Sequence, residues 1–132
     1  IKMSEQERPK LSERKLKDTL LSFSINDETE KLKSENSWIN GDRNAVTLQK
    51  NSNLRVVLIS LHKGATLSEH KVEGPITLFV LSGKMNFIAG EEKIVVETNG
   101  LIVLEKTITH DVEALEDTTF ILTIIQNKEN LK

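Results

Sequence analysis

The stretches Gly64-ATLSEHKVEGPITLFVLS-Gly83 and Gly100-LIVLEKTITHDVEA-Leu115 decide the fold of this chain. Both are rich in Val, Ile, Leu, Thr and Phe, which favour strands, and both begin at a glycine, which favours a turn. Each stretch contains one histidine, His70 in the first and His110 in the second. The two stretches therefore predict β-strands that each carry a single imidazole.

The same pattern extends over most of the chain. From Ala45 onward, short runs of strand-forming residues alternate with turn-forming clusters such as NSN, SG, AGEE and TNG. Many short strands without a helical interruption are typical of an antiparallel sandwich or barrel. We therefore predict an all-β fold. The runs are AVTLQ (45–49), LRVVLISL (54–61), PITLFVLS (75–82), KMNFIA (84–89), KIVVE (93–97), LIVLE (101–105), HDVEAL (110–115) and TTFILTIIQ (118–126).

The N-terminal part has a different composition. It is rich in Lys, Glu, Ser and Asp, and Ser12 and Asn26-Asp27 are typical of helix starts. Trp38, the only tryptophan, is expected to anchor this part to the barrel, and Asn40-Gly41 favours a turn. We predict a charged, partly helical arm over residues 1–40 and a β-domain over residues 41–132.

Composition excludes several classes of protein. The chain has 132 residues, which suits one domain, and its 18 basic residues nearly balance its 20 acidic residues. A balanced charge without a basic stripe argues against nucleic-acid binding. The absence of cysteine excludes disulfides and thiolate zinc sites. No apolar run is long enough for a membrane span or a signal peptide, so a cytoplasmic protein without membrane contact is expected.

The two stretches resemble the two sequence motifs of the cupin family. Gly64, His70 and Gly83 match the first motif, and His110 stands where the second motif has its histidine. Asn99-Gly100 takes the place of the glycine turn that opens the second motif. The resemblance implies a cupin-type jelly-roll β-barrel, with the arm outside it, and it also implies a homodimer.

The resemblance also implies a metal site, because cupins usually hold a metal with three histidines and a glutamate. Here Val72 stands in place of the second histidine and Ile76 in place of the glutamate. Catalytic metal sites normally have at least three protein ligands, and non-haem iron takes two histidines and a carboxylate. Two interpretations stay open: His70 and His110 bind a divalent transition metal, or they are polar residues at the barrel mouth without a metal.

Strand alternation predicts which residues point into the barrel. Residues at even offsets share a face, so His70 is expected to point inward with Ser68 and Val72. The same alternation places Glu69, Glu73, Asp111 and Glu113 on the outer face, where they cannot replace the missing glutamate, unless a bulge at the following Gly74-Pro75 turns Glu73 inward. His62, the third histidine, is expected at the surface or rim. The predicted pocket comprises Ser68, His70, Val72, Ile76, Leu78, Val80, Ser82, His110 and Val112.

Three functions are consistent with this pocket. A few polar groups in an apolar cavity are typical of a small-molecule site, so the first is ligand binding without catalysis and without catalytic residues. The second, which the resemblance implies, is a metal-dependent enzyme of the dioxygenase or isomerase type with His70 and His110 as ligands. The third is metal-free acid–base catalysis by a histidine, which would need a carboxylate partner that the alternation does not supply.

Overall fold

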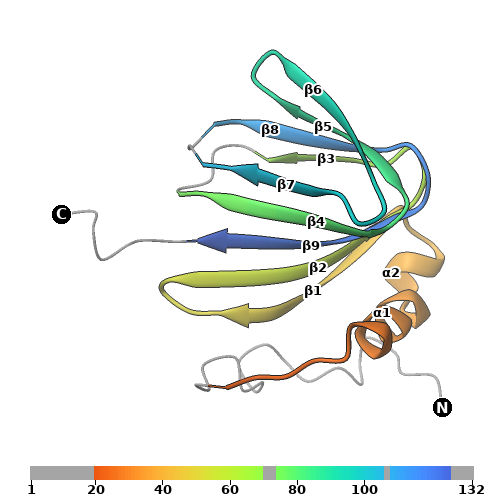
Figure 1. Ribbon diagram of the computed structural model, residues 1–132. Helices are drawn as coiled ribbons and strands as arrows, with labels where there is room; N and C mark the ends of the chain where they lie inside the picture. Colours follow the sequence, from red (N-terminus) through yellow and green to blue (C-terminus); the bar gives the residue numbers. More distant parts are fainter. Residues whose placement is uncertain (1–19, 70–73, 106–107, 126–132) are drawn as a thin grey trace.

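The computed structural model describes residues 20–69, 74–105 and 108–125, and these residues form two antiparallel sheets that face each other (Figure 1). The five-stranded sheet has the order β1-β2-β9-β4-β7, and the four-stranded sheet has the order β3-β8-β5-β6. The predicted all-β architecture with a helical arm is confirmed. The elements are α1 (Ile25–Ser34), α2 (Asn36–Ile39), β1 (Arg43–Lys50), β2 (Leu54–Leu61), β3 (Thr66–Glu69), β4 (Ile76–Ser82), β5 (Lys84–Ala89), β6 (Glu92–Glu97), β7 (Leu101–Leu104), β8 (His110–Ala114) and β9 (Thr118–Ile125).

Side chains from both sheets fill the middle of the barrel. Phe120 from β9, Val80 from β4 and Met85 from β5 are each 0% exposed and belong to one continuous core. Phe87 of β5 and Val112 of β8 complete this core from the four-stranded sheet. Close packing of this kind leaves the space for a ligand only toward an end of the barrel.

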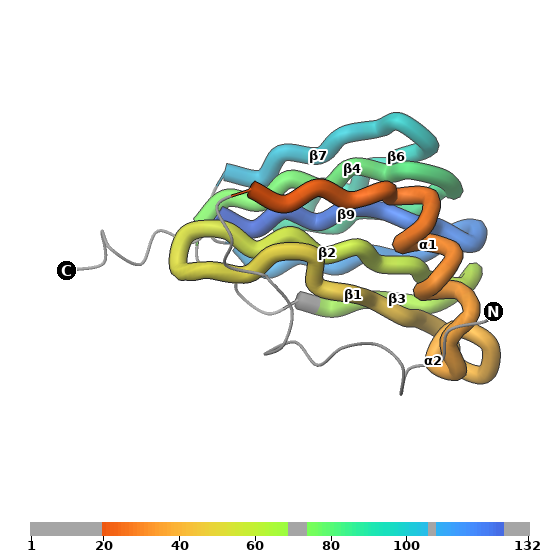
Figure 2. The backbone as a smooth tube through the Cα atoms, turned by 90° about the horizontal axis from the view of Figure 1, so that it is seen from below, coloured from red at the N-terminus to blue at the C-terminus, as the bar shows by residue number. Residues whose placement is uncertain are grey.

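The arm covers the outer face of the five-stranded sheet (Figures 1 and 2). Leu32 of α1 is 0% exposed and packs with Val46, Leu48 and Leu58 of β1 and β2 in a second core. This apolar stripe explains why a helix with a mostly polar sequence is stable at this position. The boundary between arm and barrel near residue 40 stays a prediction.

Helix α1 begins slightly earlier than the sequence suggested. Ser24 is its N-cap, and the Ser24 hydroxyl oxygen accepts a hydrogen bond from the Asp27 backbone nitrogen at 3.3 Å. The helix therefore starts at Ile25 rather than at Asn26-Asp27. The helix start predicted at Ser12 lies outside the described residues. No helix in the described ranges combines the length and the apolar character that crossing a bilayer requires.

A buried polar pair joins the arm to the barrel. Glu35 lies between α1 and α2 and is 1% exposed, and Asn44 of β1 is also buried. The Asn44 Nδ2 group donates to Glu35 Oε1 at 2.8 Å and to the Leu32 carbonyl oxygen at 2.8 Å. Buried polar groups are costly unless they are hydrogen-bonded, so Asn44 holds the end of α1 in register with β1.

We expect Asn44→Ala to lower the free energy of unfolding by about 1–3 kcal/mol, because Glu35 Oε1 and the Leu32 carbonyl oxygen lose a donor in a buried place. Urea denaturation followed by circular dichroism measures the change. Asn53→Ala is the matched control, since Asn53 is an exposed amide residue in the turn before β2, and it should change stability by less than about 0.5 kcal/mol. Equal effects of the two substitutions would contradict a structural role of Asn44.

Trp38 anchors the arm as predicted. Its ring stacks on the His62 ring at the end of β2, with 3.4 Å between ring centroids and 16° between planes. His62 Nε2 also lies 2.8 Å from the Trp38 carbonyl oxygen, and His62 Nδ1 lies 3.5 Å from Asp117 Oδ2. His62 is therefore a half-buried rim residue that contacts the arm.

Candidate functional site

His110 lies inside the barrel at the start of β8. It is 3% exposed, and its ring stacks on Phe87 with 5.5 Å between ring centroids and 20° between planes. Its Nδ1 atom lies 3.3 Å from the Ile108 carbonyl oxygen. Val112, two residues further along the strand, belongs to the barrel core, so His110 points inward as predicted.

Three predicted pocket residues of β4 also point inward. Ile76, Leu78 and Val80 are buried in the core, where they face Val112 and the other residues of the opposite sheet. Their interior position is confirmed. Whether they contact a ligand stays a prediction, and only Ile76, at the first position of β4, lies at a barrel end.

Ser82 does not point inward, and that prediction is wrong. Val80 is paired with Phe120 and Ser82 with Thr119, so Leu81 is an extra residue in the β4–β9 ladder. This bulge shifts the alternation by one residue and turns Ser82 to the outer face, where it is exposed. Strict even-offset counting fails at such a bulge.

The placement of Ser68 in the interior is also wrong. Leu67 packs against the barrel core, whereas Ser68 is exposed. The β3–β8 register pairs Leu67 with Val112 and pairs the backbone position of Glu69 with that of His110. The prediction placed Ser68 inward by counting in steps of two from His70, whereas in β3 the inward residue is Leu67. His70, Val72 and Glu73 lie outside the described residues.

Within the described residues, the carboxylates of β8 are on the outer face, as predicted. Glu113 Oε1 accepts a hydrogen bond at 3.0 Å from Asn86 Nδ2 on the neighbouring strand β5. The described residues hold no group of three or more His, Asp or Glu side chains that could bind a metal ion. Metal binding by His70 and His110 stays a prediction, because His70 lies outside these residues.

Sequence reasoning missed one charged residue of the interior, Arg55. The continuous β2–β9 register pairs Arg55 with Ile124, and Val57 and Ile59 on the same strand belong to the core, so Arg55 lies on the inner face. Its Nε atom is buried and has no hydrogen-bond partner in the described part of the chain. The signal was available in LRVVLISL, where Arg55 is in phase with Val57, Ile59 and Leu61.

Arg55 and His110 lie at the same end of the barrel. β2 begins next to Arg55 and β8 begins at His110, and these strand starts lie at the end where β9 and β3 finish (Figure 1). Half-buried apolar residues surround the core at this end, among them Leu104, which pairs with Ile76, and Ala89, which pairs with His110. We call this region the open end. It combines a guanidinium, an imidazole and hydrocarbon.

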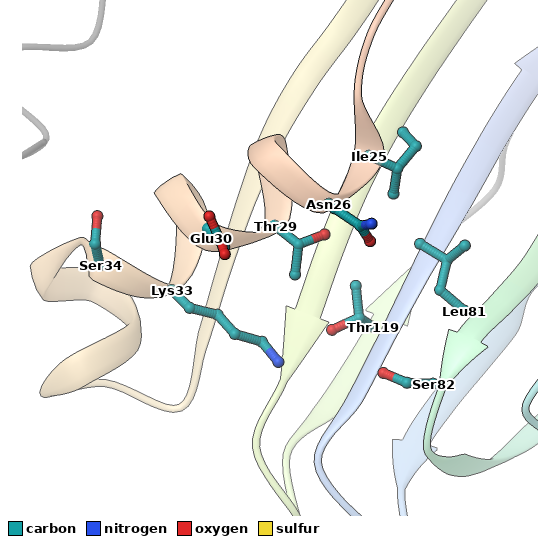
Figure 3. A pocket seen from close by; sticks show the side chains of 9 residues that line it. All are labelled: Ile25, Asn26, Thr29, Glu30, Lys33, Ser34, Leu81, Ser82 and Thr119. Carbon is teal, nitrogen blue, oxygen red and sulfur yellow. The ribbon is translucent and has the colours of Figure 1, made fainter. Parts of the chain in front are cut away.

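A cavity also lies outside the barrel. It is a groove of about 730 Å³ between α1 and the outer face of β4 and β9 (Figure 3). The close-up view shows Lys33 extending from α1 toward Ser82 and Thr119 on the sheet. Most of its polar residues are exposed, so water can satisfy them. The polar residues that line it are Asn26, Thr29, Glu30, Lys33, Ser34, Ser82 and Thr119.

No protein-family model and no curated protein matches the chain, but many solved structures do. A conserved protein of unknown function from Streptococcus pyogenes is 25% identical, with a TM-score of 0.62 over 64% of this chain and 75% of that protein. A cupin 2 conserved barrel domain protein from Leptotrichia buccalis is 26% identical, with a TM-score of 0.62 over 66% of this chain and 42% of that protein. An RmlC-like cupin with a double-stranded β-helix fold from Methanocaldococcus jannaschii is 11% identical, with a TM-score of 0.61 over 67% and 84% of the two chains, which is a likeness of fold alone.

Proposed function

Since the chain folds as a small domain of the cupin superfamily, we propose that it binds a small organic molecule at the open end of its barrel and does not catalyse a reaction. The observation that carries this proposal is the pair of inward polar residues, Arg55 and His110, on facing sheets at one end of an otherwise apolar interior. Sites for small molecules have this composition: mostly apolar walls with a few polar groups that fix the orientation of the ligand.

The packing of the interior supports the open end over the middle of the barrel. Phe120, Met85 and Val80 have no exposed surface and fill the space between the sheets. A ligand there would have to displace several of these side chains, which is costly in a close-packed core. At the open end, Leu104 and Ala89 are only half-buried, so a ligand can cover apolar surface without repacking the core.

The outer groove is a weaker candidate for a ligand site than the open end, because most of its polar residues are accessible to water. Lys33, Asn26 and Ser82 are exposed and can be hydrated, so no ligand is needed to satisfy them. Arg55 Nε is buried and lacks a partner within the described residues. A buried charged donor without a partner costs more than a neutral one, whose penalty is about 1–3 kcal/mol, and a bound acceptor would remove this cost.

The surroundings of His110 support binding rather than catalysis. A histidine base is normally oriented by a carboxylate, as in catalytic triads. The His110 Nδ1 atom instead lies near the Ile108 carbonyl oxygen, and Glu113 points to the outer face, where it accepts from Asn86. The metal-dependent enzyme with His70 and His110, and the homodimer, both stay predictions.

Binding can be tested by titrating the methyl-labelled protein with benzyl alcohol and with sodium benzoate and recording two-dimensional NMR spectra. We expect saturable shifts of the Ile124 and Leu104 methyl groups at millimolar probe, because both residues lie at the open end. The Leu58 and Val46 methyl groups, which belong to the outer core, should not shift.

A filled variant provides the control for this titration. Ala89→Phe places a ring on the inner face beside His110 and should abolish the shifts, whereas Ala45→Phe, at an exposed alanine of β1, should leave them unchanged. Shifts that persist in Ala89→Phe, or the absence of saturable binding of both probes to the wild type, would refute the proposal.

A further inference from the structure

We propose that the ligand of the open end is a small organic carboxylate, which Arg55 binds through the edge of its guanidinium that includes Nε. This inference rests on the proposed function, since it names the chemical class of ligand for the same site. Its starting point is the one buried side-chain nitrogen or oxygen that has no hydrogen-bond partner in the described ranges, Arg55 Nε.

The position of Arg55 explains why this atom needs a partner. β2 is otherwise apolar on its inner face, where Val57, Ile59 and Leu61 belong to the core. Arg55 has two neighbours across the ladders: Ile124 of β9, which is also a core residue, and Lys50 of β1, which is exposed. The Arg55 residue as a whole is only half-buried, but its Nε–H group has lost water without gaining a hydrogen bond, and that is unfavourable unless an acceptor is supplied.

The geometry of the guanidinium favours a carboxylate as this acceptor. Nε–H and one Nη–H of an arginine are parallel and match the two oxygens of a carboxylate, giving two charge-assisted hydrogen bonds. A single negative charge also balances the single positive charge of Arg55.

The other end of the ligand is expected to be apolar. Leu104 and Ala89 present half-buried hydrocarbon at the open end, and Ile76 pairs with Leu104 on the neighbouring strand. On the opposite sheet Phe87 stacks on His110, and each of the two residues is 3% exposed. A compact hydrophobic body attached to a carboxylate therefore matches both the charge and the walls of the site.

The test compares sodium benzoate with benzamide, which has nearly the same shape and no charge. We expect the wild type to bind benzoate at least about tenfold more tightly than benzamide in NMR titrations, as charge-assisted hydrogen bonds require. Arg55→Gln should remove this preference, and Arg55→Lys should retain only part of it, because an ammonium cannot form the two parallel hydrogen bonds. Arg43→Gln is the matched control and should leave the preference unchanged, since Arg43 pairs with Asp42 at 2.9 Å outside the site.

The melting temperature provides a second readout, because the cost of the buried Arg55 Nε–H group can be measured without any ligand. Arg55→Met has a similar length and no charge, so we expect it to melt at a higher temperature than the wild type and to gain nothing from benzoate. The wild type should be stabilised by benzoate, by an amount that rises with the logarithm of the benzoate concentration once this exceeds the dissociation constant. Equal binding of benzoate and benzamide, unaffected by Arg55→Gln and Arg55→Lys, would overturn the assignment of a carboxylate while leaving the proposed function intact. Failure of both probes to bind the wild type would overturn the proposed function as well.

Discussion

Phe120→Ala is expected to lower the free energy of unfolding by about 3–5 kcal/mol, the range typical of a phenylalanine removed from a packed core. The Phe120 side chain is 0% exposed and lies on the central strand of the five-stranded sheet, where it contacts the core shared with the other sheet. Truncation leaves a cavity that rigid strands on both sides cannot close. Chemical denaturation followed by circular dichroism measures the loss.

Phe79→Ala is the matched control for this prediction. Phe79 lies on the adjacent strand β4, but on the outer face and only half-buried, opposite Ile121. Because less apolar area is lost and no closed cavity forms, its cost should stay near about 1–2 kcal/mol. A loss for Phe79→Ala as large as that for Phe120→Ala would contradict the assignment of the two faces of this sheet.

Gly83→Ala is expected to cost more than about 3 kcal/mol. Gly83 connects β4 of one sheet to β5 of the other and has a φ of +107°, where side chains other than hydrogen are strained by about 1–3 kcal/mol. A Cβ atom at this position would also meet the Asp117 carbonyl oxygen and lie 2.7 Å from Thr118 Cα. Since these are backbone atoms, the turn itself must move, and this adds to the cost.

Gly90→Ala separates backbone strain from steric contact. Gly90, in the turn between β5 and β6, also has a positive φ, +60°, but a Cβ atom there meets nothing within 4 Å. We expect it to cost only about 1–2 kcal/mol, the penalty of the left-handed conformation alone. If thermal melting shows that Gly83→Ala is no worse than Gly90→Ala, the crossing between the sheets does not require a glycine.

The fold was predictable because local patterns and long-range pairing agree. Each strand-forming run from Ala45 onward overlaps a strand, and most of the turns between them carry glycine or asparagine. Strand β3 has the weakest local signal, since Thr66–Glu69 is short and polar, and it was recognisable only through the motif around His70. Its pairing with β8 is a tertiary contact that no local pattern encodes.

The candidate site was only partly predictable, because side-chain direction depends on register. Counting by two was correct for His110 and Val112 within one regular strand. It failed at Ser82, where a bulge inserts Leu81, and at Ser68, where the count began from a residue beyond the end of β3. Arg55 was missed because a charged residue near the start of a strand resembles a surface residue until the opposite sheet is in place.

The stack of Trp38 on His62 has a practical consequence for how this protein is studied. Trp38 is the only tryptophan and belongs to α2, while His62 follows directly on β2, so the indole emission reports the contact between arm and barrel. Far-UV circular dichroism, in contrast, reports the sheets. Denaturation curves recorded with both signals will superimpose if arm and barrel unfold as one cooperative unit, and they will separate if the arm detaches first. The fluorescence of this single tryptophan thus reports whether the arm and the barrel unfold together.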